Sequence, residues 1–161
     1  ANAVRATAGG LERSGIVVTG GGCGADRGAE RFSDTKGRKS GLRPSAAVIV
    51  ATVRAMKYHG GADLKTITTE NVEALAKGMV NLERHVENVQ KNYGIPCVVS
   101  INKFTSDTKA ELALLYDRMK NVVVPAVLAS PWCESGKGSA APANSADGRG
   151  EPRSASKYTA A

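Results

Sequence analysis

An unbroken apolar run at residues 46–53 (AAVIVATV), followed by a long amphipathic helix, constrains the fold of this chain more than any other feature. Strands without a polar face are typical of parallel sheets that are covered on both sides. After residue 69, apolar residues recur at spacings of three and four, at Val72, Leu75, Met79, Leu82, Val86 and Val89. This spacing predicts a helix of about six turns with one apolar stripe facing the core.

A second strand–helix unit is expected before this run. Residues 15–19 (GIVVT) have the composition of a short strand, and the glycines at 20–24 turn the chain into a helix expected over 26–36. Residues 38–44 contain Gly41 and Pro44 and are expected to form a loop. This part of the chain therefore predicts a strand, a helix and a loop in succession.

Two further strands and one helix complete the alternation. Strands are expected at 97–102 and 122–128, the latter with Pro125, which suits an edge strand or a bulge. A helix between them is marked by Ala110, Leu112, Leu115 and Met119. Residues 54–65 are expected to be a loop. The order β-α-β-α-β-α-β predicts an α/β fold with a parallel sheet and P-loop NTPase-like or Rossmann-like layers.

The last part of the chain has a different composition. Residues 134–161 are almost free of large apolar side chains, so they cannot build a core and are expected to be a disordered, low-complexity tail. The α/β domain is accordingly expected over residues 1–133.

Charge and composition argue against a nucleic-acid-binding function. The net charge is +7, and part of the excess lies near Phe32, but nucleic-acid binders usually have a denser basic stripe with several stacking aromatics. A solvated or phosphate-facing surface is expected instead, with no nucleic-acid partner.

Cysteine usage and hydropathy point to the cytoplasm. Cys23, Cys97 and Cys133 show neither metal-ligand spacing nor a disulfide framework, which favours reduced thiols. No signal peptide and no apolar run of about 18–20 residues is evident, so no membrane partner is expected. We therefore expect a cytoplasmic protein without a metal site.

Two short motifs each allow a binding and a purely structural interpretation. The glycines at 20–24, between a strand and a helix, could hold a phosphate on backbone N–H groups or could simply form a tight turn. Arg54, Lys57 and His59 follow a buried strand, at the edge where α/β sheets bind ligands, but a solvated loop explains them equally well. Thr108 and Glu111 have capping-box spacing.

Taken together, four consecutive blocks resemble the formate–tetrahydrofolate ligase family. The blocks are VVTGGGCGADRGAERFSDTKGR (17–38), SGLRPSAAVIVATVRAMKYHGG (40–61), ENVEALAKGMVNLERHVEN (70–88) and VVSINKFTSDTKAEL (98–112). They occur in the family's order, and the resemblance extends over about residues 12–138. Four blocks in order are far more specific than any single motif.

The resemblance implies a reaction and a set of site residues. Enzymes of this family use MgATP to activate formate as formyl phosphate, which the N10 amine of tetrahydrofolate then attacks. The two aromatic residues that hold the pterin correspond to Phe104 and Trp132, and Leu128 corresponds to a position near the adenine. Formate, ATP and folate are therefore the expected partners, and the family further implies a homo-oligomer.

The departures from the family pattern are also informative. The family's glutamate, phenylalanine and leucine in its TEAGFGADL motif are Gly20, Cys23 and Arg27 here, and Arg27 places a charge on an expected core position. The phosphate-binding GKTT loop and the formate-binding arginine have no counterpart in this sequence. We therefore expect a fragment of a larger multidomain ligase, inactive alone. An inactive α/β remnant and a nucleotide- or phosphate-binding module without ligase activity are the alternatives.

Overall fold

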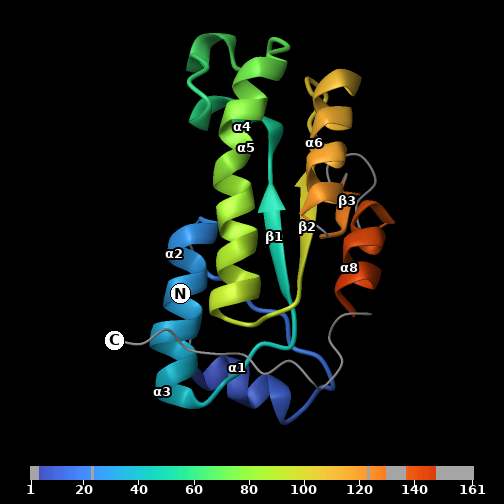
Figure 1. The fold of residues 1–161 in the computed structure, drawn as a ribbon. Coiled ribbons are helices and arrows are strands. Elements are labelled where there is room, and N and C mark those ends of the chain that lie inside the picture. Colours follow the sequence, from blue (N-terminus) through green and yellow to red (C-terminus); the bar gives the residue numbers. More distant parts are fainter. Residues whose placement is uncertain (1–3, 23, 123, 130–136, 148–161) are drawn as a thin grey trace.

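A three-stranded parallel sheet forms the centre of the chain in a computed structural model, which describes residues 4–22, 24–122, 124–129 and 137–147 (Figure 1). Its strands, in spatial order, are β1 (Ala47–Ala51), β2 (Cys97–Asn102) and β3 (Ala126–Ala129). All pairings are parallel, so the predicted α/β fold is confirmed. The third strand is shorter than expected and begins directly after Pro125, which cannot donate a ladder hydrogen bond.

One face of the sheet packs against three helices that hold the core. These helices are α4 (Val53–His59), α5 (Val72–Glu87), which continues as the π-helix η3 (Asn88–Asn92), and α6 (Lys109–Asn121). The predicted stripe on α5 is confirmed, because Leu75, Met79, Leu82 and Val86 are buried, and Val89 is buried on η3. They pack with alternate residues of β1 and β2 in one apolar cluster.

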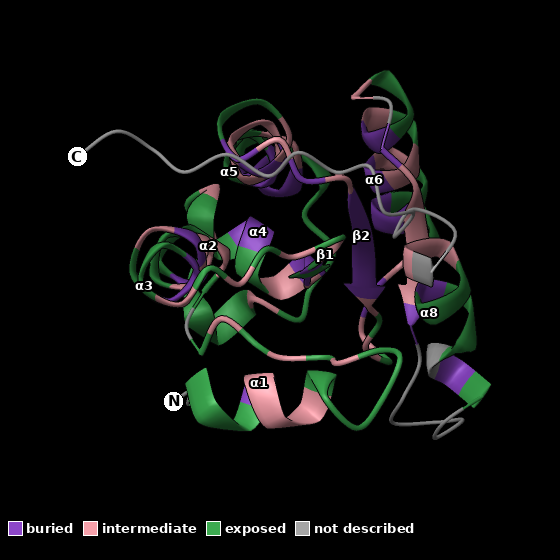
Figure 2. Cartoon of the chain, turned by 90° about the horizontal axis from the view of Figure 1, so that it is seen from below, coloured by how far each residue is buried: buried purple, intermediate pink, exposed green. Residues whose placement is uncertain are grey.

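The other face of the sheet is only partly covered. Figure 2 shows α1 (Val4–Leu11) and α8 (Ala140–Asp147) on the side opposite α5 and α6. Helix α8 packs against β2 and β3. On β1, however, Val48 and Val50 remain 46% and 63% exposed.

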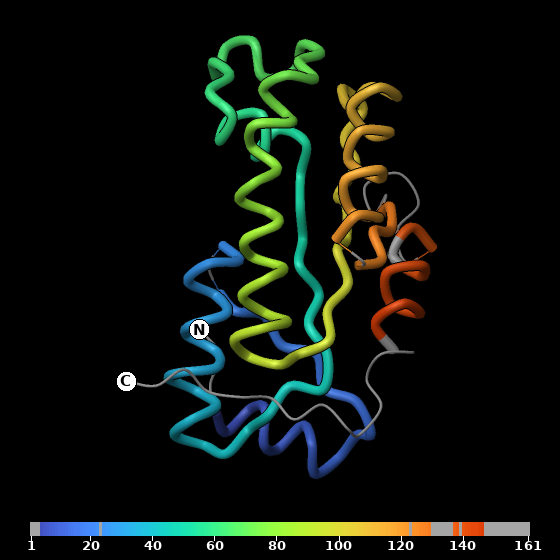
Figure 3. The backbone as a smooth tube through the Cα atoms, viewed as in Figure 1, coloured from blue at the N-terminus to red at the C-terminus, as the bar shows by residue number. Residues whose placement is uncertain are grey.

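The amino-terminal helices lie toward the end of the sheet where the strands begin (Figure 3). The helical segment that follows the glycines consists of α2 (Ala25–Glu30), the π-helix η1 (Arg31–Gly37) and α3 (Arg38–Ser40). It is longer than predicted, because residues 38–40, expected to belong to a loop, are helical. Lys36 Nζ donates a 2.7 Å hydrogen bond to Thr7 Oγ1, and Tyr93 Oη donates to Asp34 Oδ2 at 3.0 Å. These contacts join η1 to α1 and to the segment before β2. The helix ends at Gly41, whose φ of 70° suits glycine.

Two further sequence predictions about local structure are wrong. Residues 15–19 do not form a strand of the described sheet, and their side chains Ile16 and Val18 are 71% and 93% exposed. Residues 54–65, expected to be a loop, contain α4 and the 3-10 helix η2 (Leu64–Thr66). Thr52 caps α4, its Oγ1 accepting from the Ala55 N–H at 3.1 Å.

The carboxyl-terminal stretch also differs from its prediction where it is described. Within residues 134–161, expected to be disordered, the structure contains the 3-10 helix η4 (Lys137–Ser139) and α8. Pro142 of α8 is buried, so small residues pack here without the large apolar side chains on which the prediction depended. Residues 134–136 and 148–161 lie outside the described residues, and the domain boundary at residue 133 stays a prediction.

Candidate functional site

The carboxyl ends of β1 and β2 bring two distant segments of the chain together. Strand β1 leads into α4, whose first turn carries Arg54, and β2 leads into the turn 104–107 before α6. Arg54 Nη2 donates a 3.2 Å hydrogen bond to Ser106 Oγ, which joins the two segments. Ligands of α/β sheets bind at this edge, so it is the first place to look for a site.

Phe104, one of the residues implied by the family resemblance, lies at this edge. Its side chain is half-buried, and the guanidinium carbon of Arg54 lies 4.4 Å from the centroid of its ring. The backbone N–H of Phe104 donates to Asp107 Oδ2 at 2.8 Å, and the Asp107 N–H donates back to the Phe104 carbonyl at 3.1 Å. The turn is therefore closed in both directions, and the ring is fixed in place by the backbone and by Arg54.

Several polar atoms at this edge are buried without a hydrogen-bond partner in the described part of the chain. They are Arg54 Nε, Asn102 Oδ1 and Asp107 Oδ1. Burial raises the pKa of Asp107, although the Phe104 N–H opposes this shift. Buried polar groups are usually satisfied, so unpaired ones gathered near one edge are a reason to expect a bound molecule there.

The two other residues implied by the resemblance have different outcomes. Leu128 lies in β3, pairs in register with Ile101 and packs half-buried against the core. Trp132 lies outside the described residues, so its position beside Phe104 stays a prediction. The parallel β2–α6–β3 unit on which that prediction depends is present.

Lys57, which the sequence places among possible ligand-binding residues, has a structural role. Its Nζ lies 2.8 Å from Glu111 Oε1, donates to the Thr69 carbonyl at 3.0 Å, and is inaccessible to a ligand. His59 is exposed at the end of α4. Of the three basic residues in this segment, Arg54 is therefore the one with contacts at the candidate site.

Sequence reasoning missed the pairing of Lys57 with Glu111. The predicted capping box is confirmed, because Thr108 Oγ1 accepts from the Glu111 N–H and Glu111 Oε2 accepts from the Thr108 N–H. The other carboxylate oxygen, Oε1, also accepts from the Asn71 N–H at 3.0 Å. The capping signal was visible in the sequence, but nothing local indicated that the same carboxylate joins α4, α5 and α6.

The glycines at 20–24 have steric roles where they are described. A Cβ on Gly21 would lie 2.8 Å from the Gly28 backbone, and Gly22 has a φ of 77°. Both positions therefore require glycine for a tight turn against α2. The predicted tight turn is therefore present, and the binding of a phosphate there stays a prediction.

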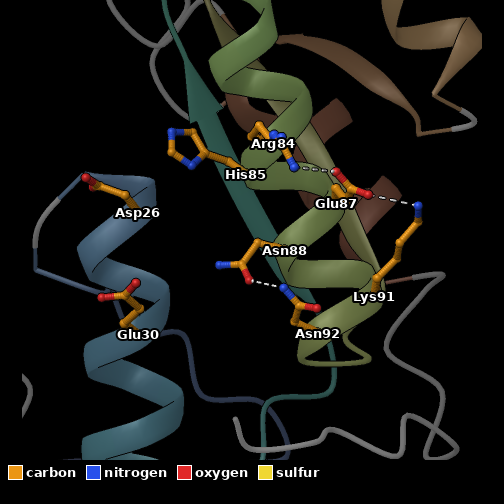
Figure 4. Close-up of a pocket in the computed structure, with 8 residues that line it drawn as sticks. All are labelled: Asp26, Glu30, Arg84, His85, Glu87, Asn88, Lys91 and Asn92. Atoms are coloured by element: carbon orange, nitrogen blue, oxygen red, sulfur yellow. Dashed lines mark hydrogen bonds and ion pairs between the residues drawn. The ribbon is translucent and has the colours of Figure 1, made fainter.

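A surface groove lies at the opposite end of the core. It measures about 440 Å³ and is lined by side chains of α2, α5 and η3, namely Asp26, Glu30, Arg84, His85, Glu87, Asn88, Lys91 and Asn92 (Figure 4). Burial lowers the pKa of His85, while Asp26 acts in the opposite direction. The groove contains none of the residues predicted for a site.

Neither a metal centre nor a membrane span is found in the described residues. No group of three or more His, Cys, Asp or Glu side chains there could hold a metal ion. None of the described helices is both long and apolar enough to cross a bilayer.

Comparison with known proteins gives one consistent result. A family model described as formate–tetrahydrofolate ligase matches residues 1–158. The formate–tetrahydrofolate ligase of Methylibium petroleiphilum is 58% identical over 137 residues, which are 85% of this chain and 24% of that relative. The ligase of Methylococcus capsulatus is 52% identical over 140 residues, which are 87% of this chain and 25% of that relative. The ligase of Lacticaseibacillus paracasei is 50% identical over 143 residues, which are 89% of this chain and 26% of that relative.

The chain spans about a quarter of the length of these relatives. The family match includes residues well beyond 133, and so covers α8 as well as the strands and helices of the core. With a family match over nearly its whole length, this chain belongs to the formate–tetrahydrofolate ligase family.

Proposed function

We propose that this chain supplies the pterin-binding segment of a formate–tetrahydrofolate ligase. The complete reaction converts ATP, formate and tetrahydrofolate into ADP, phosphate and 10-formyltetrahydrofolate through formyl phosphate. The observation that carries the proposal is the place of Phe104, a half-buried aromatic ring fixed at the carboxyl edge of a parallel sheet. Of the two phenylalanines of the chain, Phe104 is the one at this edge, since Phe32 lies on η1.

In this proposal, Phe104 and Trp132 hold the pterin ring between them. Stacking of a heterocycle on an aromatic side chain contributes about 1–3 kcal/mol in nucleic-acid complexes, which are the nearest analogue. Leu128 is proposed to lie near the adenine of ATP. Because Leu128 packs against the core, only the exposed part of its side chain is available for such a contact.

The described residues do not fit Mg²⁺ or a triphosphate. They contain no metal-binding group of acidic, histidine or cysteine side chains, and Lys57 is already paired with Glu111. We therefore assign the binding of Mg²⁺, of the triphosphate and of formate to parts of the ligase fold outside this chain, and Leu128 is proposed to contact the adenine alone.

Two properties of the complete enzyme belong to the same proposal. We expect the ligase to act in the cytoplasm, as the cysteine usage of this chain suggests, and to assemble as a homo-oligomer, as the family implies. Size-exclusion chromatography with light scattering on the complete enzyme tests the second expectation.

A chimeric enzyme tests the proposed function. Residues 12–138 of this chain would replace the matching segment of the Methylibium petroleiphilum ligase, and formate-dependent ADP release would be measured with tetrahydrofolate and MgATP. Turnover by the chimera supports the proposal. A folded chimera without turnover favours the alternative of an inactive remnant, and contradicts the proposal if the second chimera below is inactive as well.

The three departures from the family pattern provide a second, diagnostic chimera. It carries Gly20→Glu, Cys23→Phe and Arg27→Leu together. Arg27 is exposed in the structure and therefore causes no buried charge in this chain. If only this second chimera is active, the departures inactivate an otherwise competent segment.

A further inference from the structure

Arg54 holds one face of the Phe104 ring from a different part of the chain. Its guanidinium carbon lies 4.4 Å from the ring centroid, a distance at which a cation is attracted to the face of an aromatic ring. The same guanidinium donates to Ser106 Oγ at 3.2 Å, so its position over the ring is fixed from a second side.

The backbone on both sides of this contact is also fixed. Arg54 lies in the first turn of α4, which is capped by Thr52, and Phe104 lies in the turn that Asp107 closes. The Lys103 N–H donates to the Ala129 carbonyl at 3.0 Å, which anchors the residue before Phe104 to β3. The ring and the guanidinium therefore meet as two parts of one rigid edge.

Two polar atoms of this arrangement, Arg54 Nε and Asp107 Oδ1, are buried and make no hydrogen bond within the described residues. An unpaired buried donor or acceptor is costly, and a molecule bound beside the ring could satisfy these atoms. They therefore support a ligand at this edge, next to the ring that Arg54 covers.

We propose that Arg54 is a positioning residue of the folate site. Its guanidinium covers one face of Phe104 and directs the pterin to stack on the other face. This inference rests on the proposed function, because it assumes that Phe104 contacts the pterin. Loss of a cation–π contact of this kind should weaken pterin binding about two- to fivefold.

The test is isothermal titration calorimetry of the full chain with tetrahydrofolate under nitrogen. Arg54→Ala should raise Kd about two- to fivefold, and Arg54→Lys should raise it less, because an ammonium is still attracted to the ring face but lacks the planar group. Ser106→Ala should raise Kd less, since the guanidinium stays over the ring. Arg84→Ala removes an exposed arginine at the opposite end of α5 and should leave Kd unchanged. Melting temperatures are measured for every variant.

The possible outcomes separate this inference from the proposed function. If the unmodified chain binds and Arg54→Ala binds equally well or more tightly, the positioning role is wrong while the folate site stands. A loss of binding matched by a fall in melting temperature assigns Arg54 to the fold instead. If the folded, unmodified chain does not bind tetrahydrofolate, the folate site itself is contradicted, and Arg54's role with it.

Discussion

Lys57 Nζ lies 2.8 Å from Glu111 Oε1, and their side chains are only 1% and 0% exposed. The pair joins α4 to α6, and Glu111 also accepts from the Asn71 N–H at the start of α5. Three helices around the carboxyl edge therefore depend on one buried carboxylate.

Replacing Lys57 by Met should destabilise the chain strongly. Glu111 would remain buried without its counter-charge, and breaking buried pairs of this kind costs about 3–5 kcal/mol. The double variant Lys57→Met, Glu111→Gln should recover much of that loss, because no unpaired charge remains and the glutamine Oε1 can still accept from the Asn71 N–H. Urea unfolding followed by circular dichroism measures both. Lys77→Met, which breaks an exposed pair with Glu73, is the control and should change little. Equal stability of Lys57→Met and this control would contradict a stabilising role of the Lys57–Glu111 pair.

The free energy of unfolding at acidic pH should depend on the ionisation of Glu111. Burial alone would raise its pKa, but the hydrogen bond from Lys57 and those from the Asn71 and Thr108 N–H groups outweigh burial and lower it below 4.5. An acid with a lowered pKa in the folded state stabilises the fold above its ordinary pKa, and this stability is lost as the pH falls through the folded-state value. Unfolding free energy should therefore fall below pH 4.5, and a flat profile there would contradict this account.

Asp107 should have the opposite effect. Burial raises its pKa above 3.8, although the Phe104 N–H opposes this shift, so the fold loses stability as the pH rises through the raised value. Asn can still accept the Phe104 N–H but carries no charge. Asp107→Asn should therefore gain stability relative to the unmodified chain as the pH rises from 3.8 toward neutrality. Parallel pH profiles of the two proteins would show that this carboxylate is not the cause.

Helices α4 and α5 approach so closely that neither Gly60 nor Gly78 tolerates a side chain. A Cβ on Gly78 would overlap the Met56 carbonyl oxygen, and one on Gly60 would overlap that of Ala74. Gly78→Ala should therefore destabilise the chain by about 1–3 kcal/mol, as overpacking does. Gly9→Ala is the matched control, because its Cβ meets nothing within 4 Å in α1 and alanine favours a helix. A stabilising Gly78→Ala would contradict the close packing.

The isolated chain should not release ADP in a formate-dependent manner with tetrahydrofolate and MgATP. Phosphoryl transfer is accelerated mainly by positioning and by stabilisation of charge, and no sequence resembling the family's phosphate-binding loop occurs here. Turnover clearly above an enzyme-free blank would contradict this expectation. An equal amount of the complete Methylibium petroleiphilum ligase serves as the positive control.

The parts of the fold that the sequence predicts best have strong local patterns. The stripe from Leu75 to Val86 sets the buried face of α5, and 97–102 forms β2 at the expected bounds. Helix α4 was missed because its buried face combines Val53 and Met56 with a buried lysine, which no local apolar pattern reveals. A strand at 15–19 was wrongly expected because composition does not show whether a neighbouring strand and a covering layer are present.

The candidate site was predictable only in part. The family blocks identify Phe104, and the parallel topology places it at the carboxyl edge. The contact with Arg54 could not be foreseen, because it joins residues 50 positions apart through a loop and a helix start (104 − 54). The same holds for Lys57 and Glu111, whose pairing depends on how three helices pack.

Quenching of the single tryptophan, Trp132, by tetrahydrofolate tests the central claim most directly. We expect saturable quenching. Phe104→Ala should weaken the binding free energy obtained from the titration by about 1–3 kcal/mol, as the loss of other stacking contacts does. Phe32→Ala is the matched control, because Phe32 is also half-buried with a cation, Lys36 Nζ, 4.9 Å from its ring centroid, but lies on η1. N-acetyltryptophanamide, measured in parallel, corrects for light absorbed by the pterin. Unchanged Trp132 emission at millimolar tetrahydrofolate, in a sample shown to be folded, would contradict a pterin site in this chain.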